Sequence, residues 1–145
     1  MLEEVKEYIG EFIYSCDDEE LVNVVANKLM DRRLTLSCAE SCTGGLFASR
    51  MTDIAGISKV FNRGLVTYSN EAKIQELGVR PETLEEFGAV SEETAREMAE
   101  GLAAVSGSDV CISVTGIAGP DGGTEETPVG TVFIGISTKK GTTFR

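Results

Sequence analysis

The sequence contains no histidine, and this absence removes more chemistry than any other feature of its composition. Catalytic sites that pair serine or cysteine with histidine are excluded, and so is a histidine general base. A hydrolase built from this chain would need lysine, a carboxylate, tyrosine or metal-bound water as its base. Serine paired with lysine is a known arrangement of that kind.

Cysteine is sparse and does not form a metal-binding pattern. The four cysteines, Cys16, Cys38, Cys42 and Cys111, contain no C-x-x-C pair. Without histidine they cannot complete a mixed zinc site. We therefore expect no metal centre, and we expect reduced and mostly buried thiols rather than a disulfide framework.

Long apolar runs and an excess of cations are also lacking. No run approaches the roughly 18 residues of a membrane span, and the N-terminus lacks the basic-then-apolar order of a secretory signal, so we expect a cytoplasmic protein without membrane contact. The net charge of -11 weighs against general affinity for nucleic acid, because that affinity depends on cations that displace counterions from phosphates. A small anionic ligand remains compatible if backbone N–H groups bind it locally.

The segments that are present alternate between helix and strand over a length that suits one domain. Apolar spacing and capping residues predict helices at 19–32 (N-cap Asp18), 43–52, 70–77, 81–87 and 92–106 (N-cap Ser91). Short apolar runs predict strands at 34–38, 64–68, 109–114 and 130–137. The last two runs are typical of strands buried on both faces. The pattern predicts an α/β fold, a three-layer α/β/α sandwich with a largely parallel or mixed central sheet.

Polar side chains follow three of these strands. Ser41 follows the first, Tyr68 ends the second with Lys73 one turn into the next helix, and Thr115 follows the third. Ligands bind outside the carboxyl ends of parallel strands in open α/β sheets, so these residues converge on one crevice if the strands run parallel and adjacent. An antiparallel strand at 64–68 would place Lys73 on the far side. Lys73 is then either an ordinary exposed helix lysine or a desolvated base for a serine proton.

Two glycine-rich stretches have both a structural and a functional interpretation. The stretch AESCTGG, residues 39–45, is either a closely packed helix start capped by Ser41 or Thr43, or a catalytic turn. In a catalytic turn Ser41 ranks above Cys42 as nucleophile, because the thiol would need a helix N-terminus or a lysine to lower its pKa. The loop TGIAGPDGG, residues 115–123, either exposes N–H groups that hold a phosphate or an oxyanion, or is a mobile surface loop.

Four stretches together carry a resemblance to a known family. They are AESCTGG, RGLVTYSNEAKIQELGV, AVSEETAREMAEGL and SVTGIAGPDGGTEETPVGTVFIGI, in unbroken order over residues 21–137. They resemble the C-terminal domain of the CinA family, the competence/damage-inducible proteins, which includes nicotinamide mononucleotide deamidases. The resemblance implies an amidohydrolase that converts nicotinamide mononucleotide to nicotinate mononucleotide and ammonia in pyridine nucleotide recycling, with no cofactor, on an α/β/α fold that forms homodimers.

The same resemblance implies roles for individual residues. Ser41 is similar in placement to the family's catalytic serine, Lys73 to its lysine and Tyr68 to its tyrosine. Substrate-binding positions are expected at Thr43, Gly44, Gly45, Thr115, Gly116 and Gly119. The resulting hypothesis is that neutral Lys73 takes the Ser41 proton directly or through Tyr68, that Ser41 attacks the carboxamide carbon, and that N–H groups of residues 42–45 or 115–123 hold the oxyanion.

The resemblance also divides the chain. Residues 1–18 resemble a segment that connects this domain to a preceding one in longer two-part proteins, and residues 19–145 resemble the amidohydrolase domain. Family members continue beyond the KKGTTFR stretch through a basic segment and a final helix, so we expect a last strand or helix, and an arginine there, to be missing. The competing hypotheses are a noncatalytic nucleotide-binding or assembly domain of a longer CinA-like protein, and a structural dimerisation module.

Overall fold

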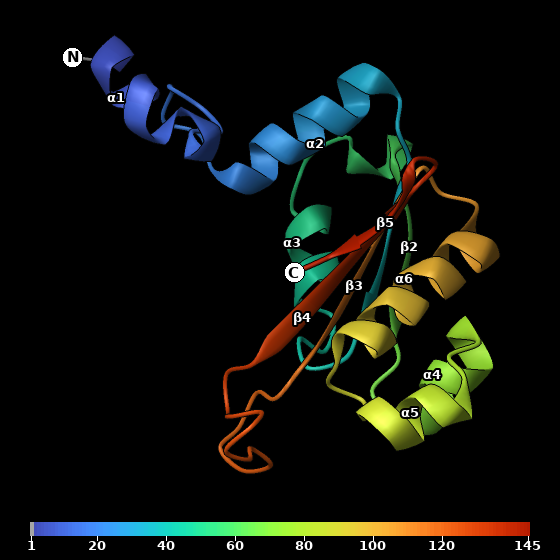
Figure 1. Cartoon of the computed structure of the whole chain (residues 1–145). Coiled ribbons are helices and arrows are strands. Elements are labelled where there is room, and N and C mark those ends of the chain that lie inside the picture. The colour runs from blue at the N-terminus through green and yellow to red at the C-terminus, as the bar shows by residue number, and fades with distance from the viewer. Residues whose placement is uncertain (1) are drawn as a thin grey trace.

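A five-stranded sheet in the order β2-β1-β3-β4-β5 organises the chain (Figure 1). The computed structural model describes residues 2–145, and the side chains of residues 6–145. The strands are β1 Leu36–Glu40, β2 Phe61–Val66, β3 Val110–Gly116, β4 Val132–Thr138 and β5 Gly141–Phe144. β1 pairs in parallel with both β2 and β3, whereas β4 and β5 are added antiparallel. The sheet is therefore mixed, and its three parallel strands are adjacent.

Helices cover both faces of the sheet. They are α1 Leu2–Ile9, α2 Leu21–Arg32, α3 Leu46–Thr52, α4 Asn70–Leu77, α5 Pro81–Phe87 and α6 Glu92–Ser106, with 3-10 turns η1 Gly10–Phe12 and η2 Ile57–Lys59. The fold is the expected α/β/α arrangement, in which α2 and α3 lie on one face and α4, α5 and α6 on the other. α1 and η1 project from the body as an N-terminal arm (Figure 1).

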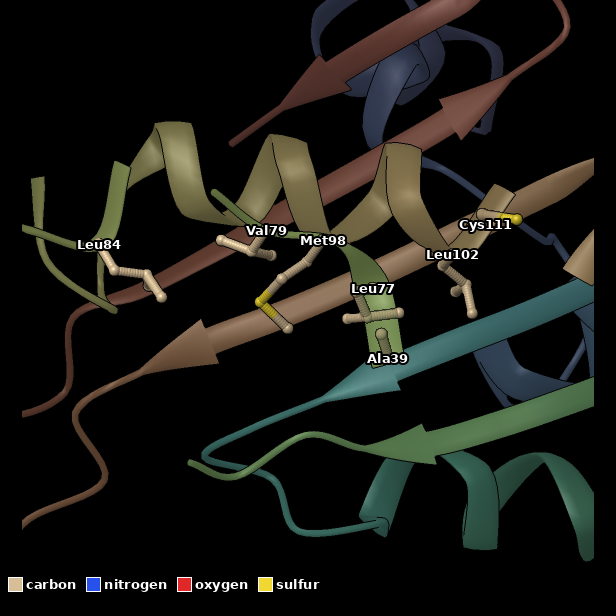
Figure 2. Packing of buried hydrophobic residues seen from close by; sticks show 7 residues of the cluster. All are labelled: Ala39, Leu77, Val79, Leu84, Met98, Leu102 and Cys111. Atoms are coloured by element: carbon tan, nitrogen blue, oxygen red, sulfur yellow. The ribbon is translucent and has the colours of Figure 1, made fainter. Parts of the chain in front are cut away.

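The residues of β1 divide between two apolar cores because successive side chains of a strand point to opposite faces. Leu36 joins the cluster beneath α2 and α3, whereas Ala39 joins the cluster beneath α4 and α6. Figure 2 shows this second cluster, in which Met98 and Leu102 of α6 lie above Ala39. β1 is consequently buried along its whole length.

β4 differs from its predicted environment. Its side chains at Val132, Ile134 and Ile136 are exposed, so this strand is covered on one face and not on both. The helices α2 and α3 do not extend over it, and an apolar cleft of about 700 Å³ lies between them and residues Val132 and Ile134. The strand predicted from the apolar run 130–137 is therefore present, but the prediction that it is buried on both faces is wrong.

Several predicted boundaries shift for local reasons. α2 begins at Leu21 after Glu20, without a side-chain cap, so Asp18 is not its N-cap. β1 begins two residues late because the Leu34 N–H still donates to Leu29 at the end of α2. α3 begins at Leu46, since Gly44 and Gly45 adopt positive φ angles and form a turn. β2 lies at 61–66 rather than 64–68.

The caps of α4 and α6 follow their sequence signals. Ser69 accepts a hydrogen bond from the N–H of Ala72, and Ser91 accepts one from that of Thr94. Within residues 2–145, no helix has the length and apolar character that a membrane span needs.

Candidate active site

Ser41 and Lys73 meet at the carboxyl ends of the three parallel strands. The Ser41 N–H donates to the Val114 carbonyl of β3 at 2.9 Å, and the Thr67 N–H donates to the Glu40 carbonyl at 2.8 Å. These bonds extend the ladder by one residue and place Ser41 between the ends of β2 and β3. From α4, the Lys73 Nζ reaches to 3.0 Å from the Ser41 Oγ.

Three oxygen atoms surround the Lys73 amine. Besides the Ser41 Oγ, Nζ contacts the carbonyl oxygens of Thr67 at 2.8 Å and Tyr68 at 3.4 Å. Lys73 is only 1% exposed. Burial lowers the pKa of its amine, with the nearby Cys42 acting in the opposite direction. A neutral amine can donate to both carbonyls and still offer its lone pair to the Ser41 hydroxyl, which is the one partner of the three that can donate.

Local sequence explains how Lys73 reaches this place. Ser69 caps α4, and the Lys73 N–H donates to the Ser69 carbonyl at 3.1 Å. The cap fixes the direction in which the helix leaves the end of β2, so that its first turn stands over Ser41. The positively charged form loses hydration there without gaining a carboxylate partner among the residues described, which is the arrangement that favours a neutral lysine.

Cys42 lies beside this pair but has the properties of a protonated thiol. Burial raises its pKa, and the N–H groups of Cys42 and Thr43 together with Lys73 only partly oppose that effect. The end of β3 approaches closely, since a side chain at Gly116 would meet both the Cys42 sulfur and the Thr131 carbonyl oxygen. Gly116 is therefore adjacent to the turn that carries Ser41.

The other expected site residues are placed differently. Tyr68 contributes its carbonyl, while its side chain is 71% exposed. The Thr115 hydroxyl is buried and donates to the Ala89 carbonyl at 2.7 Å, which ties β3 to the segment before α6. Gly119, with a φ of 80°, packs against Val129 inside the loop that joins β3 to β4. Of these three, only the main chain of Tyr68 contacts the Ser41 and Lys73 pair.

In the turn of residues 41–45, some backbone N–H groups donate main-chain or carboxylate hydrogen bonds and others do not. The Gly44 N–H donates to the Ser41 carbonyl and the Gly45 N–H donates to the Glu40 carboxylate. The N–H groups of Cys42 and Thr43 make no main-chain hydrogen bond in the described structure and lie near the Cys42 sulfur. They follow the serine directly, which is the place of oxyanion donors in strand-to-helix nucleophile turns.

Two features of the site were not anticipated from the sequence. The Thr67 carbonyl, at 2.8 Å, is the shortest contact of Lys73, and the fully buried Glu40 holds the start of α3. The alternation of side chains along β1 was an available signal for Glu40, since it places residues 36, 38 and 40 on one face. Among residues 6–145, whose side chains the structure describes, no group of three or more acidic or cysteine side chains could hold a metal ion.

Comparison with known proteins identifies the family. Residues 18–145 match the family model described as the CinA C-terminal domain. The chain belongs to the CinA family. A CinA-like protein of Kosmotoga olearia is 56% identical over 133 residues, which cover 92% of this chain and 32% of that relative. A relative from Acetivibrio thermocellus, also 56% identical, matches 98% of this chain and 34% of its own length. This CinA chain thus spans about a third of the length of these relatives.

Solved structures of CinA proteins share the fold. A competence/damage inducible protein from Agrobacterium tumefaciens superposes with a TM-score of 0.85 at 46% sequence identity, covering 92% of this chain and 81% of that one. A competence damage-inducible protein from Klebsiella pneumoniae gives 0.83 at 42% identity, covering 86% of this chain and 78% of that one. The three-layer arrangement is therefore the CinA fold.

Proposed function

We propose that this CinA-family chain hydrolyses an amide, with Ser41 as nucleophile and Lys73 as its base. The observation that carries the proposal is the 3.0 Å contact between the Ser41 Oγ and a buried Lys73 Nζ. Burial lowers the pKa of Lys73, which increases the neutral fraction that can accept a proton at physiological pH. Because the chain has no histidine, lysine is the base that fits the contact.

The proton balance of the reaction follows from the contacts of the amine. The Ser41 O–H proton moves to the Lys73 Nζ as Oγ bonds to the carboxamide carbon, and the carbonyl oxygen becomes an oxyanion. We assign stabilisation of that oxyanion to the N–H groups of Cys42 and Thr43, which follow the serine directly. Lys73 then gives its proton to the leaving nitrogen, and ammonia departs. Water then attacks the Ser41 ester while Lys73 takes a proton from it. Lys73 returns this proton to Oγ as the ester C–O bond breaks, which releases the acid product and regenerates Ser41 and neutral Lys73.

The direct contact favours proton transfer without Tyr68 as an intermediary, since the Tyr68 side chain is exposed while its carbonyl orients the amine. It also favours Ser41 over Cys42. Burial raises the pKa of the Cys42 thiol, and a protonated thiol is a poor nucleophile. The hydroxyl, in contrast, stands at hydrogen-bond distance from its base.

Nicotinamide mononucleotide is the proposed substrate, with nicotinate mononucleotide and ammonia as products. This assignment rests on the sequence resemblance to the deamidases of the family, and the uncharged carboxamide suits a base that is itself neutral. On the same ground we propose that the chain acts as a cytoplasmic homodimer without a metal or cofactor. The N–H groups of residues 42 and 43 are the substrate contacts that the turn geometry supports.

The test is turnover of nicotinamide mononucleotide by the purified chain, with ammonia and nicotinate mononucleotide measured separately. Ser41→Ala should lower kcat on the order of 10³-fold or more, because the covalent step is lost. Cys42→Ala is the matched neighbour and should retain most of the activity.

Other outcomes would separate the alternatives. Near wild-type turnover by Ser41→Ala with an inactive Cys42→Ala would make the thiol the nucleophile. Calorimetric binding of nicotinamide mononucleotide without ammonia release would support a noncatalytic nucleotide-binding domain. Neither binding nor turnover would support a structural dimerisation module.

A further inference from the structure

Glu40 and Ser41 are neighbours in sequence but face opposite sides of the sheet. Leu36 of β1 packs with α2 and α3, and two residues further Cys38 lies beneath Ala48 of α3, where its sulfur contacts the Glu40 carboxylate at 3.8 Å. Ser41 turns the other way and meets Lys73 of α4. Glu40 is therefore separated from the reacting hydroxyl by the backbone of β1, and it cannot serve as its base.

The Glu40 carboxylate caps α3 from the preceding strand. Oε2 accepts from the N–H groups of Gly45 at 3.1 Å and Phe47 at 3.0 Å, and Oε1 accepts from that of Ala48 at 2.9 Å. Gly45 occupies the N-cap position and has no side chain to cap the helix. The role that a serine or aspartate normally plays from the N-cap position is thus played by a residue five positions earlier.

The carboxylate is fully buried and its charge is balanced by these contacts. Burial acts to raise the pKa of Glu40, but the Thr43 side chain and the N–H groups of Ala48, Phe47 and Gly45 outweigh that effect and leave the pKa below its usual value. The ionised group lies at the positive end of the α3 dipole, where a negative charge is stabilised. The first N–H groups of α3 are consequently occupied within the chain itself.

These bonds close the turn of residues 41–45 into a ring. One end of the turn is the last residue of β1, and the other end is attached to the side chain of that same residue. Ser41, Cys42 and Thr43 lie inside the ring, with Gly44 and Gly45 supplying the positive φ angles that the reversal needs. The direction of the Ser41 side chain and of the two following N–H groups is set by this closure.

We propose that Glu40 is a positioning residue of the CinA chain: by capping α3 it holds Ser41 beside Lys73 and leaves the N–H groups of Cys42 and Thr43 available for the oxyanion. The inference rests on the proposed amide hydrolysis. It also means that α3 does not offer its N-terminus to the phosphate of a substrate, because the Glu40 carboxylate already occupies it.

The decisive variant is Glu40→Gln, which keeps the size of the side chain and removes its charge and one acceptor. A misplaced nucleophile lowers kcat, so we expect a loss on the order of 10²-fold per folded molecule with KM changed far less. Circular dichroism gives the folded fraction used for normalisation. Glu97→Gln is the matched control, since Glu97 also accepts hydrogen bonds from a backbone N–H and two side chains but lies away from Ser41.

A second measurement needs no variant. In the wild-type chain the N–H groups of Gly45, Phe47 and Ala48 should exchange slowly with solvent deuterium, although the first N–H groups of a helix ordinarily lack partners and exchange fast. Fast exchange at these three positions would overturn the cap. This result keeps the inference testable if Glu40→Gln does not fold.

The outcomes of the two proposals are distinguishable. A wild-type chain that releases no ammonia contradicts the proposed function. An active wild type together with a Glu40→Gln variant of equal kcat per folded molecule contradicts the positioning role alone. A rise in KM at unchanged kcat would do so as well, because it would place Glu40 in substrate binding.

Discussion

The Lys73 amine is enclosed by two backbone carbonyls and one hydroxyl, an unusual place for a group that is charged in water. This burial among three oxygen atoms distinguishes Lys73 from an ordinary helix lysine, whose amine is exposed to solvent. The carbonyls fix the nitrogen and can only accept, so proton exchange is confined to Ser41. Burial lowers the pKa of the amine, and in the proposed mechanism the contact with Ser41 sets the direction of proton transfer.

A lowered pKa has a consequence for stability. The pKa of Lys73 in the folded chain lies below the value of about 10.4 for an unfolded lysine. At pH values between the two, the unfolded chain binds more protons than the folded one. Folding therefore becomes more favourable as pH rises through this range. Lys73→Met lacks this effect. We expect wild type to gain free energy of unfolding relative to Lys73→Met as pH is raised from neutral toward that value.

Urea unfolding of both proteins at a series of pH values measures this difference. Lys28→Met, at an exposed position of α2, controls for the loss of a lysine in general. A difference between wild type and Lys73→Met that stays constant with pH would mean that the folded chain does not depress the pKa of Lys73.

Single residues also show what the sequence could and could not predict about the site. Ser41 and Lys73 were predictable as neighbours because the ends of adjacent parallel strands meet at one edge. The direction of Tyr68 was not, since it depends on how the chain leaves β2. The Thr115 hydroxyl is taken by Ala89, which is 26 residues away, and no local pattern reveals such a partner.

Among the secondary-structure elements, α6 supports the candidate site, because α4, which carries Lys73, packs against it. Gly101 of α6 allows this approach. A Cβ at that position would run into the backbone of Leu77 at the end of α4. The absence of a side chain therefore sets how closely the two helices lie.

Gly101→Ala tests the contact between these helices. In an open helix the change would stabilise by roughly 1 kcal/mol, but the clash with Leu77 should reverse the sign and destabilise by about 1–3 kcal/mol. Chemical denaturation measures the change. Glu100→Ala, one residue earlier and exposed, should stay within about 0.5 kcal/mol of wild type. A Gly101→Ala chain that is more stable than wild type would contradict the close approach.

Elements with local signals were predicted best. α4, α5 and α6 have their caps or initiating proline in the sequence, and their bounds agree with expectation. α3 begins three residues later than predicted, because Gly44 and Gly45 form a turn and the side chain that caps the helix is that of Glu40 and not of Ser41 or Thr43. Burial of β4 on both faces was also wrong, since an apolar run alone does not reveal how far the covering helices extend.

The whole molecule combines a strongly acidic charge with a sheet that is covered unevenly. A net charge of -11 gives no general attraction for an anionic substrate, so under the proposed function nicotinamide mononucleotide would be bound by local groups. Of the parallel strands, β1 is buried along its whole length and β3 along most of it, whereas most residues of the edge strand β2 are exposed. β4 is also exposed on one face, beside the apolar cleft at α2 and α3. The prediction of an α/β/α fold with a mixed sheet is confirmed. The edge strand β5 was not predicted, because only its antiparallel pairing with β4 reveals it.

Trapping of the acyl intermediate tests the central claim most directly. The chain is mixed with nicotinamide mononucleotide, quenched in acid within one turnover, and digested for mass spectrometry of the peptide that holds Ser41 and Cys42. We predict an acyl group of the mass expected for nicotinate mononucleotide less water, bound as an ester to Ser41 and absent from Ser41→Ala. An adduct on Cys42, or ammonia release with no adduct under conditions where deacylation is slow, would contradict the assignment of Ser41 as nucleophile.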